Sequence, residues 1–550
     1  MSGAGDGSVK GAPATSTKPD VSRIAHDAFG YAALRPGQQE ASAALAAGRD
    51  CLIVMPTGAG KSAIYQMAAI ALGGPAVVVS PLVSLQHDQA RHLSEHGLPA
   101  VSVNATAKDK ARNQAWSLLR DGAVGFVFLA PEQLARGDVR DMLSASPPVL
   151  LAVDEAHCVS AWGHDFRPDY LRTGDVTGSL ARRPVVAALT ATAAPPVREE
   201  IVQRLRMRDP ARVVRGFDRP EIHLAVRAFH DADTKEAAVV ETAAGFDGTG
   251  IVYAATREET CAYAERLGVR PYHAGLRKTE RSQTERAFMN GETLVATSAF
   301  GMGIDRPDVR FVVHASVPGS LDEYYQEVGR AGRDGQPASA VCFYRPEDLG
   351  LRRFFVGGLP DGALLGKVAA LAQAPTSRRE LARQAGMSER RLTSVLNLLE
   401  AAGSVRLRRQ VEPVADAPPP DEAAARATEI AEHHRSVERS RVEMMRRYAE
   451  LDDCRRRFLL RYFGEDADEP CGRCDNCDAG RSAPAGGHGA FAPGMRVEHQ
   501  DWGRGIVLAD TGERLTVFFD EVGYKELLTD AVLSGQILAP AGTGAGAGAA

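Results

Sequence analysis

The stretch that decides the fold is Met55-Pro56-Thr57-Gly58-Ala59-Gly60-Lys61-Ser62. An apolar run precedes it at 51–54, and a helix-compatible segment follows it at 63–69. A strand, a glycine loop and a helix in this order form a phosphate cradle, because backbone N–H groups and the helix N-terminus face the anion. Lys61 supplies a positive charge to the β- and γ-phosphates, and the Ser62 hydroxyl is placed to ligate Mg²⁺. We predict a nucleotide site formed by Thr57, Gly58, Ala59, Gly60, Lys61 and Ser62.

Further apolar runs after the glycine loop predict the strands of one sheet. They lie at 76–79, 126–129, 149–153 and 185–189. Helix-compatible segments separate them, so we expect a parallel sheet that is covered on both faces. Asp154 and Glu155 directly follow one run, which places them at the sheet edge where open α/β sheets bind ligands. Asp154 is expected to hold Mg²⁺ through water and Glu155 to polarise the attacking water. The alternative is an acidic turn without a function.

Length and composition bound the possibilities. A chain of 550 residues is long enough for three to five domains, at about 100–200 residues each. The net charge of −5 gives no global attraction to nucleic acid, so such a partner requires local positive surfaces. No apolar run reaches the roughly 18–20 residues of a membrane span, which predicts a soluble protein with no membrane partner. Residues 1–20 contain no apolar segment typical of a secretion signal, and we expect a disordered tail.

The eight cysteines divide into two groups. Four are scattered in apolar contexts, and four cluster as Cys454, Cys471, Cys474 and Cys477. The last three have the spacing C-x2-C-x2-C, and four thiolates closing a tetrahedron suit structural Zn²⁺. An iron–sulfur cluster is the alternative, which absorption in the visible region would reveal. The pattern favours a reducing, cytoplasmic compartment.

A second series of strand-like runs predicts a second α/β lobe that has no phosphate loop. The runs lie at 250–254, 273–276, 294–297 and 311–314. Arg330 and Arg333 follow this series and are three residues apart, so on a helix they share one face. One lobe that binds nucleotide and another that reaches across the cleft with arginines are the parts of a two-lobe motor.

Together these motifs resemble the RecQ-type DNA helicases of superfamily 2. The resemblance rests on the segments Phe29–Tyr31, Leu34–Gln38, Met55–Ser62, Ser80–Gln89, Ala130–Glu132, Asp154–Tyr170 and Leu189–Ala193. It covers roughly residues 25–350 and 436–478. It implies an ATP- and Mg²⁺-dependent helicase that unwinds DNA with 3′ to 5′ polarity in repair and recombination, in the cytoplasm and associated with the nucleoid.

The resemblance also implies roles for individual residues. Tyr31, Arg35 and Gln38 match the adenine-recognition motif of the family. Residues 324–335 match its arginine-finger motif, with catalytic roles for Gln326, Arg330 and Arg333. Arg333 is expected to be the finger that stabilises charge on the γ-phosphoryl group, and Arg330 to assist it.

The loop that runs on from Asp154 is expected to sense DNA and to signal to the ATPase site. Its expected DNA-binding and coupling residues are His157, Trp162, His164, Phe166 and Arg167. Aromatic faces stack on unpaired bases and basic groups meet phosphate, which is the combination found in single-strand platforms. Tyr170 offers a further aromatic face. The alternative for any one of these rings is a place in the core.

The C-terminal third predicts three small modules. Residues 360–412 have the pattern of a winged helix, in which Ser388 caps a helix carrying Arg390 and Arg391 near its start. This module is expected to contact DNA, with protein docking or scaffolding as alternatives. It precedes the zinc module, whereas the winged helix of the family follows it. A linker is expected at 413–424, a zinc module at 425–480, an SH3- or Tudor-like barrel for protein docking at 490–538, and a flexible tail at 539–550.

The predicted fold is therefore α/β, with two tandem RecA-like lobes at 21–215 and 216–350 followed by these three modules. The leading hypothesis is a DNA helicase with ATP, Mg²⁺ and Zn²⁺ as cofactors, and with single-stranded and duplex DNA as partners. An RNA helicase is the nearest alternative. A DNA-docking or regulatory protein that uses ATP as a switch, without separating strands, is the alternative from another class.

Overall fold

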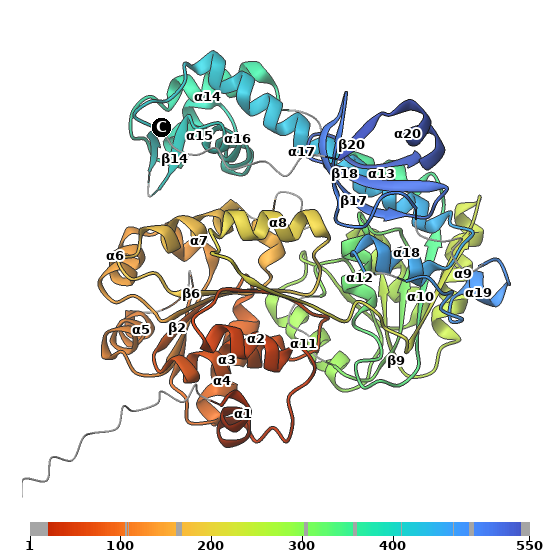
Figure 1. The fold of residues 1–550 in the computed structure, drawn as a ribbon, viewed down its shortest axis with the longest axis horizontal. Coiled ribbons are helices and arrows are strands. Elements are labelled where there is room, and N and C mark those ends of the chain that lie inside the picture. Colours follow the sequence, from red (N-terminus) through yellow and green to blue (C-terminus); the bar gives the residue numbers. More distant parts are fainter. Residues whose placement is uncertain are drawn as a thin grey trace, which may run out of the picture.

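The structure is a computed structural model that describes most of the 550 residues. The described residues are 20–104, 107, 109–160, 168–301, 306–355, 360–408, 410–465, 467–482 and 489–540. Two parallel-sheet lobes lie side by side, and the C-terminal modules lie against both of them (Figure 1). Within the described residues, none of the helices combines the length and the apolar character needed to cross a membrane.

Lobe 1 is built on a seven-stranded sheet in the order β3-β4-β2-β5-β6-β1-β7, in which every pairing is parallel. Its strands are β1 (Cys51–Val54), β2 (Pro75–Val79), β3 (Ala100–Val103), β4 (Gly125–Leu129), β5 (Leu150–Val153), β6 (Val185–Thr190) and β7 (Ala211–Val214). Its helices are α1 (Val21–Phe29), α2 (Gln38–Ala46), α3 (Lys61–Leu72), α4 (Val83–Glu95), α5 (Asp109–Asp121), η1 (Pro131–Ala135), α6 (Gly137–Ala145), η2 (Ala156–Val159), α7 (Pro168–Ser179) and α8 (Pro195–Arg204).

Alternation along the strands divides the core of lobe 1 between two faces. Cys51 and Ile53 of β1 pack in the cluster that contains α1, α2 and α3, whereas Leu52 and Val54 pack in the cluster that contains α5 and α6. All four side chains are completely buried. Because successive strand residues point to opposite faces, a wholly apolar strand requires helices on both sides. This is the doubly covered parallel sheet that the sequence predicts.

Lobe 2 repeats this plan with a six-stranded parallel sheet in the order β10-β11-β9-β12-β13-β8. Its strands are β8 (Ile222–Ala228), β9 (Thr249–Tyr253), β10 (Arg270–Tyr272), β11 (Leu294–Ala296), β12 (Val309–His314) and β13 (Ala338–Tyr344). Its helices are α9 (Ala232–Ala244), α10 (Arg257–Leu267), α11 (Lys278–Met289), α12 (Leu321–Val328) and α13 (Asp348–Phe355). Helix α12 carries Gln326 and ends at Val328, so Arg330 and Arg333 lie in the turns that follow it and do not share a helix face as the sequence suggested; the glycines at 329 and 332, the second with a φ of 62°, end the helix there.

A small helical module follows lobe 2 and matches the predicted winged-helix pattern. It contains α14 (Gly362–Leu371), α15 (Arg378–Ala385), α16 (Glu389–Ala401) and the antiparallel hairpin of β14 (Val405–Leu407) and β15 (Val411–Pro413). Ser388 caps α16 by accepting a hydrogen bond from the Arg391 N–H at 3.3 Å, as expected. The hairpin is held on lobe 1, because Arg172 of α7 donates to the Leu407 carbonyl at 2.6 Å.

One long helix corrects the linker expected at 413–424. Helix α17 spans Pro420–Ala449, so it begins inside that stretch. Its first turns supply Ala423, Ala424 and Ala427 to the core of the helical module. Proline is well tolerated in the first turn of a helix, and alanine is the best helix former. The last proline of this stretch is therefore the first residue of α17, and the alanines after it continue the helix. The helical module and the zinc module are therefore joined by a continuous helix.

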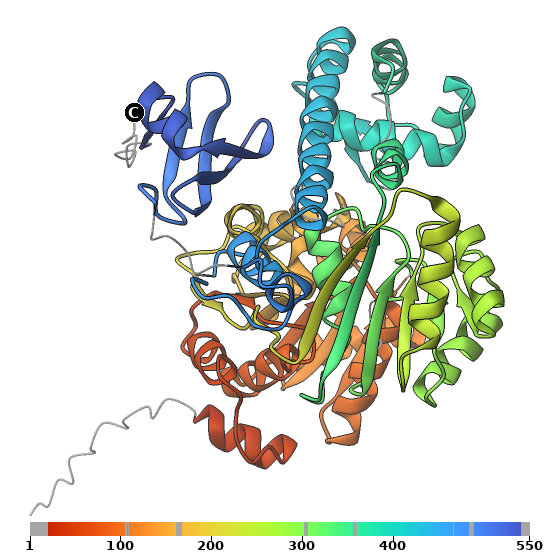
Figure 2. The same cartoon turned by 90° about the vertical axis from the view of Figure 1, so that its right-hand side faces the viewer.

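The zinc module and the barrel complete the chain. The zinc module uses the end of α17, α18 (Arg455–Tyr462) and α19 (Asp475–Asp478). The barrel has the antiparallel order β19-β18-β17-β16-β20. Its elements are β16 (Arg496–His499), β17 (Gly503–Asp510), β18 (Arg514–Phe519), β19 (Gly523–Leu528), α20 (Thr529–Gly535) and β20 (Leu538–Pro540). Figure 2 shows α17 rising from the lobes between the helical module and the barrel.

Candidate nucleotide site and zinc centre

Three neighbouring strands of lobe 1 end at the same edge of the sheet. The order β5-β6-β1 places Asp154, Thr190 and Met55 side by side, each directly after or at the end of its strand. The Met55 N–H donates to the Thr190 carbonyl at 3.1 Å, which ties the start of the glycine loop to β6. The segments predicted to carry the chemistry are therefore assembled by strand order, as expected for open parallel sheets.

The glycine loop has the backbone of a phosphate cradle. Gly58 and Gly60 have φ angles of 81° and 75°, in the left-handed region that favours glycine. Lys61 is the first residue of α3, and its ammonium donates to the carbonyls of Met55 at 3.0 Å and Pro56 at 3.2 Å. Burial lowers the pKa of Lys61, although Glu155 and Asp154 oppose this shift. The ammonium and the N-terminus of α3 are together suited to hold an anion.

Ser62 and Asp154 have the ligand chemistry that Mg²⁺ requires. Asp154 is buried and accepts a hydrogen bond from the Ser80 hydroxyl at 3.4 Å, and Gln89 donates to the Ser62 hydroxyl at 3.0 Å. Burial, followed by the neighbouring Glu155, raises the pKa of Asp154 to about 7, with Lys61 acting against it. A desolvated carboxylate beside a hydroxyl is a typical half-site for a hard cation that also binds phosphate oxygens. The residues present therefore fit Mg²⁺.

Glu155 adopts a conformation that is rare for glutamate. Its φ and ψ are both 48°, in the left-handed region, and strained residues of this kind concentrate at functional sites. Its Oε2 atom is buried, and no hydrogen bond to it is formed among the described residues. The Glu155 side chain as a whole is 16% exposed, so a water molecule would reach the carboxylate at its other oxygen.

His157 links this carboxylate to strand β6. The His157 Nδ1 atom lies 3.4 Å from Glu155 Oε2 and 2.9 Å from Thr190 Oγ1. Thr190 Oγ1 donates to the Thr192 carbonyl at 3.0 Å, so the imidazole donates to the threonine. His157 is only 1% exposed and does not reach a surface where DNA could bind. Its burial argues against a direct DNA contact, and its coupling role stays a prediction.

Two of the three residues predicted to recognise adenine, Arg35 and Gln38, contact the glycine loop. The Gln38 carboxamide donates to the carbonyls of Ala59 at 3.2 Å and Gly60 at 3.0 Å, and Arg35 donates to the carbonyl of Gly58. Tyr31 stacks on Phe29 with a centroid distance of 5.6 Å. Gln38 is thus bonded to the loop itself in this structure, and its contact with adenine stays a prediction.

Arg333 of lobe 2 reaches the glycine loop of lobe 1. A methyl group placed on Gly58 would lie 3.4 Å from Arg333 Cδ, an ordinary van der Waals distance. The positive charge of Arg333 also contributes to the lowered pKa of Lys61, after burial as the main cause. Arg330 is buried, and a methyl group on Gly301 would lie only 2.6 Å from its Nη2 atom. The structure therefore brings both half-sites together across the cleft.

The loop expected to bind single-stranded DNA is only partly within the described residues. Trp162, His164, Phe166 and Arg167 lie outside them. Tyr170, expected as a further stacking face, is completely buried and donates its hydroxyl to the Asp154 carbonyl at 3.1 Å. Its ring is part of the lobe 1 core and is not a platform for bases.

Sequence reasoning did not assign roles to Ser80 and Gln89. Ser80 follows β2, the neighbour of β5, so its position after a strand end was a usable signal. Gln89 lies within α4, and nothing in the local pattern shows that its side chain turns toward Ser62. Tyr65 of α3 donates its hydroxyl to Gln89 and fixes that orientation.

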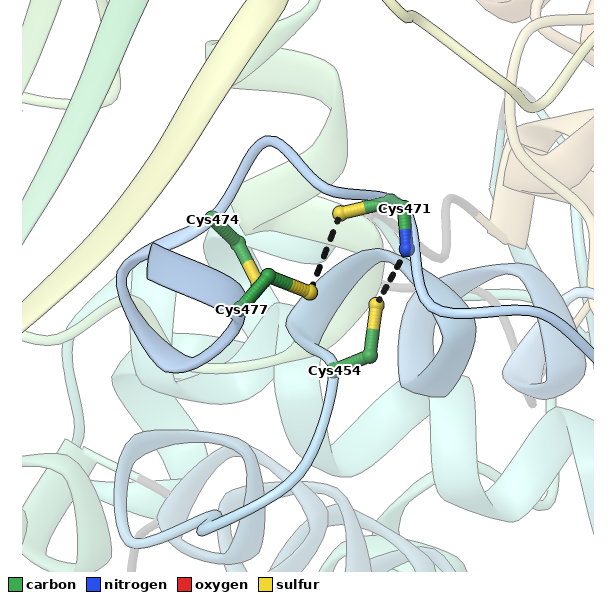
Figure 3. A group of neighbouring side chains, drawn as sticks. All are labelled: Cys454, Cys471, Cys474 and Cys477. Carbon is green, nitrogen blue, oxygen red and sulfur yellow. Dashed lines mark hydrogen bonds between the residues drawn. The ribbon is translucent and has the colours of Figure 1, made fainter. Parts of the chain in front are cut away.

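The four clustered cysteines form a zinc centre. Their sulfur atoms all lie within 4.8 Å of one another, and Figure 3 shows the side chains converging from two segments of the chain. The Cys454 sulfur accepts backbone N–H groups from Cys471 at 3.3 Å and Arg457 at 3.5 Å. Hydrogen bonds within the cluster lower the pKa of Cys454 and raise that of Cys471, so without a metal the thiols share protons that Zn²⁺ would displace. The donor set fits the Zn²⁺ predicted from sequence.

The zinc centre covers the open edge of the lobe 2 sheet. Cys474 pairs with Leu224 of the edge strand β8 as an isolated parallel bridge. The Asp475 carboxylate accepts the Val226 N–H at 2.9 Å, and Arg473 donates to the Pro220 carbonyl at 2.8 Å. Covering an edge strand in this way satisfies its unpaired backbone groups. The zinc module therefore packs on lobe 2 as a continuation of its sheet edge.

Comparisons with known families agree with this arrangement. Residues 35–201 match the DEAD/DEAH box helicase model, 234–335 the helicase conserved C-terminal domain and 415–478 the RecQ zinc-binding model. A crystal structure of the DUF1998 helicase MrfA bound to DNA has the same fold over 73% of this chain and 60% of its own. Its TM-score is 0.51 and its sequence identity 18%.

Curated relatives extend over most of the chain. The ATP-dependent DNA helicase RecQ of Pasteurella multocida is 33% identical over 82% of this chain and 61% of its own length. RecQ of Bacillus subtilis is 33% identical over 83% of this chain and 66% of its own length, so the chain spans less than two thirds of both. The probable ATP-dependent DNA helicase RecS of Bacillus subtilis is 31% identical over 82% of this chain and 90% of its own length. The chain therefore belongs to the RecQ family of helicases.

Proposed function

We propose that this chain is an ATP- and Mg²⁺-dependent DNA helicase that moves 3′ to 5′ along single strands and unwinds duplexes in repair and recombination. The observation that carries the proposal is the position of Arg333 against Gly58, which brings a lobe 2 arginine to the phosphate cradle of lobe 1. Its relatives bear the name ATP-dependent DNA helicase. Polarity and biological role come from the family resemblance.

The residues of the two half-sites have complementary tasks in this proposal. Lys61 and the loop N–H groups would bind the triphosphate, and Ser62 and Asp154 would hold Mg²⁺, whose charge would offset that of the phosphates. Glu155 orients the attacking water. Arg333, assisted by Arg330 and Gln326, stabilises the charge that develops on the γ-phosphoryl group. Opening and closing of the cleft would then change the spacing between two DNA-binding lobes.

The helical module offers a second surface for DNA. Its residues 360–413 include nine Lys and Arg but only five Asp and Glu, in a chain whose net charge is −5. Exposed arginines lie at the starts of α15 and α16 and on β14: Arg378, Arg379, Arg390, Arg391 and Arg406. Arginines at helix N-termini are suited to phosphate contacts, so this face is proposed to bind duplex DNA.

The decisive test compares partial duplexes with a 3′ or a 5′ single-stranded tail. Strand separation should require ATP and Mg²⁺ and should occur on the 3′-tailed substrate. Lys61→Ala, which removes the phosphate-binding ammonium, is the blank. Separation of the 5′-tailed duplex alone would contradict the polarity, and activity in the Lys61→Ala protein would contradict the assigned site.

Assays with the same protein preparation also distinguish two alternative functions. An RNA helicase would hydrolyse ATP faster with RNA than with DNA. A protein that uses ATP only as a switch would hydrolyse it without separating either substrate. If the chain is a DNA helicase, single-stranded DNA should stimulate its ATP hydrolysis, and the same preparation should separate DNA strands.

The barrel is proposed to bind a protein partner through the face that the rest of the chain leaves exposed. Leu528 and Leu533 are 58% and 51% exposed, respectively, and both lie in or beside the barrel. Their replacement by serine should weaken that binding without changing ATP hydrolysis. Association with the nucleoid is proposed as a consequence of DNA binding.

A further inference from the structure

The first turn of α12 contains a buried carboxylate that the C-terminal modules reach. Asp322 is 2% exposed and accepts a hydrogen bond from the Tyr462 hydroxyl of α18 at 2.6 Å. The Tyr462 oxygen also lies 2.9 Å from the Tyr524 hydroxyl of β19. Tyr462 has one proton and gives it to the carboxylate, so Tyr524 is the donor in the second bond. A relay of two hydrogen bonds thus runs from the barrel to α12.

The barrel is seated firmly enough on α17 to define the position of Tyr524. The Tyr524 N–H donates to the Ser440 hydroxyl at 3.0 Å. Gly523 has a φ of 73°, and a methyl group there would lie 2.2 Å from Ser440 Oγ and 3.1 Å from the Val437 Cα. Only glycine permits this approach of strand to helix. Leu508, Phe518 and Tyr524 belong to the same core cluster as lobe 2 and the zinc module.

Charge compensation makes this relay specific. Arg441 of α17 is 1% exposed and pairs with Glu438 at 2.6 Å. Burial opposes its charge, yet Glu438 and Asp322 raise the pKa of Arg441 above its ordinary value. Asp322 also stands at the N-terminal end of α12, where the helix dipole favours a negative charge. Asp322 and Arg441 are both buried, so removing either charge leaves the other without compensation.

The opposite end of α12 leads directly to the arginines. The helix ends at Val328, and the Arg330 N–H still donates to the Glu327 carbonyl at 3.2 Å. From Asp322 to Val328 the helix rises by about 9 Å, and Arg330 lies in the turn that follows. Tyr324, in the same helix, has its hydroxyl 3.1 Å from that of Tyr448 in α17. A displacement of the first turn is therefore carried along a short, stiff element to both arginines.

We propose that Tyr462, Asp322 and Tyr524 are positioning residues for ATP hydrolysis, through which the zinc module and the barrel hold α12 so that Arg330 and Arg333 meet the glycine loop. This inference rests on the proposed function, because it assigns the arginines to catalysis. It gives the barrel an internal task in addition to any docking partner.

The test uses the full-length chain and removes single hydroxyl groups. Tyr462→Phe abolishes both bonds of the relay but keeps the packed ring, and Tyr524→Phe abolishes one. Tyr344→Phe is the matched control, because the Tyr344 hydroxyl also joins lobe 2 to α17, through Glu450, but does not contact α12. With saturating single-stranded DNA, kcat for ATP should fall about tenfold in Tyr462→Phe and about threefold in Tyr524→Phe. The loss is smaller than for removal of Arg333, because the arginine is displaced but still present. The KM for ATP should change less than twofold, since the residues that bind ATP in lobe 1 are untouched.

Hydrogen exchange provides a readout that does not depend on activity. Backbone amides of α12 should exchange faster in Tyr462→Phe than in the parent or in Tyr344→Phe. If Tyr462→Phe keeps both the kcat and the α12 exchange of Tyr344→Phe, the positioning role is refuted. A parent chain that does not hydrolyse ATP would refute the proposed function instead, and the exchange comparison would still decide whether the relay holds α12. An equal loss of kcat in Tyr344→Phe and Tyr462→Phe would also refute the relay, because it would indicate a general loss of stability.

Discussion

The two lobes have the same parallel-sheet plan but assemble their halves of the nucleotide site in different ways. In lobe 1, the cradle is a loop of six residues between β1 and α3, and its contacts come from the end of β6 and from Arg35 and Gln38 of the same lobe. In lobe 2, Arg330 and Arg333 follow a helix that is contacted by α17 and α18, more than a hundred residues later in the chain. The first half-site is local, and the second is supported by distant segments.

Because of this difference, the half-site of lobe 1 should tolerate distant substitutions better than the half-site of lobe 2. A cradle formed by backbone N–H groups depends on two glycines and one strand order, and it tolerates change elsewhere in the chain. An arginine that must reach across a cleft depends on every contact that fixes its helix. Substitutions far from the nucleotide should therefore affect catalysis through lobe 2 more than through lobe 1.

The largest expected effect comes from removing the arginine that meets the cradle. Arg333→Ala should lower kcat for ATP by about 10³-fold or more, because arginine fingers act chiefly on the transition state. The KM for ATP should stay within a few-fold of the parent value, in contrast to Lys61→Ala, which weakens binding as well. Steady-state kinetics with saturating single-stranded DNA measure both constants. Arg277→Ala, at a position 81% exposed in lobe 2, serves as the control and should leave kcat unchanged.

Loss of zinc should damage lobe 2 before lobe 1. Cys474→Ser should release the metal and uncover β8, at a cost above about 4 kcal/mol in the free energy of unfolding. Metal analysis and hydrogen exchange of β8 and β1 would locate the damage. Cys261→Ser, at an exposed thiol outside the cluster, is the control. Equal deprotection of both strands would contradict the distinction between the lobes.

Removing a contact that joins lobe 1 to the helical module should cost less unfolding free energy than loss of the zinc. Arg172→Ala removes the bond to the Leu407 carbonyl and the 3.5 Å pair with Glu400. Since the Arg172 side chain is 17% exposed, we expect a loss of about 1.5–3 kcal/mol, typical of hydrogen bonds to charged groups. Urea unfolding measures it, and Arg91→Ala, in an exposed pair, should cost under about 0.5 kcal/mol. If the two variants cost the same, the helical module is not held on lobe 1 by this arginine.

The smallest expected effect is a pH dependence of Mg²⁺ binding in lobe 1. The pKa of Asp154 is raised to about 7 by burial first and Glu155 second, so below pH 7 the metal must displace a proton. The apparent Mg²⁺ affinity should therefore weaken by nearly tenfold for each pH unit below 7, or about 1.4 kcal/mol, and should level off above it. Titrations of ATP hydrolysis with Mg²⁺ between pH 6 and 8.5 would show this. An affinity independent of pH would indicate that Asp154 is already ionised at pH 6.

Much of the site could be predicted because its signals are short. Gly58, Gly60, Lys61 and Ser62 lie within five residues, and the cysteines 471, 474 and 477 within seven. The four sulfur atoms do converge, as the spacing predicts. The same reasoning failed at residues 420–424, where a proline was taken to continue a linker although it begins α17. It also failed at Tyr170, because the aromatic composition of a loop does not reveal which rings are buried.

The sequence by itself determined the local chemistry of this protein: the cradle, the paired acidic residues, the zinc ligands and the two-lobe order of strands and helices. Only the tertiary structure decided that Arg333 lies against Gly58, that α17 belongs to two modules at once, and that the barrel reaches Asp322 through Tyr462. The physical reason is one of range. Periodicity and motif spacing report on neighbours within a few turns or one strand, whereas these contacts join residues up to hundreds of positions apart and depend on how complete modules pack.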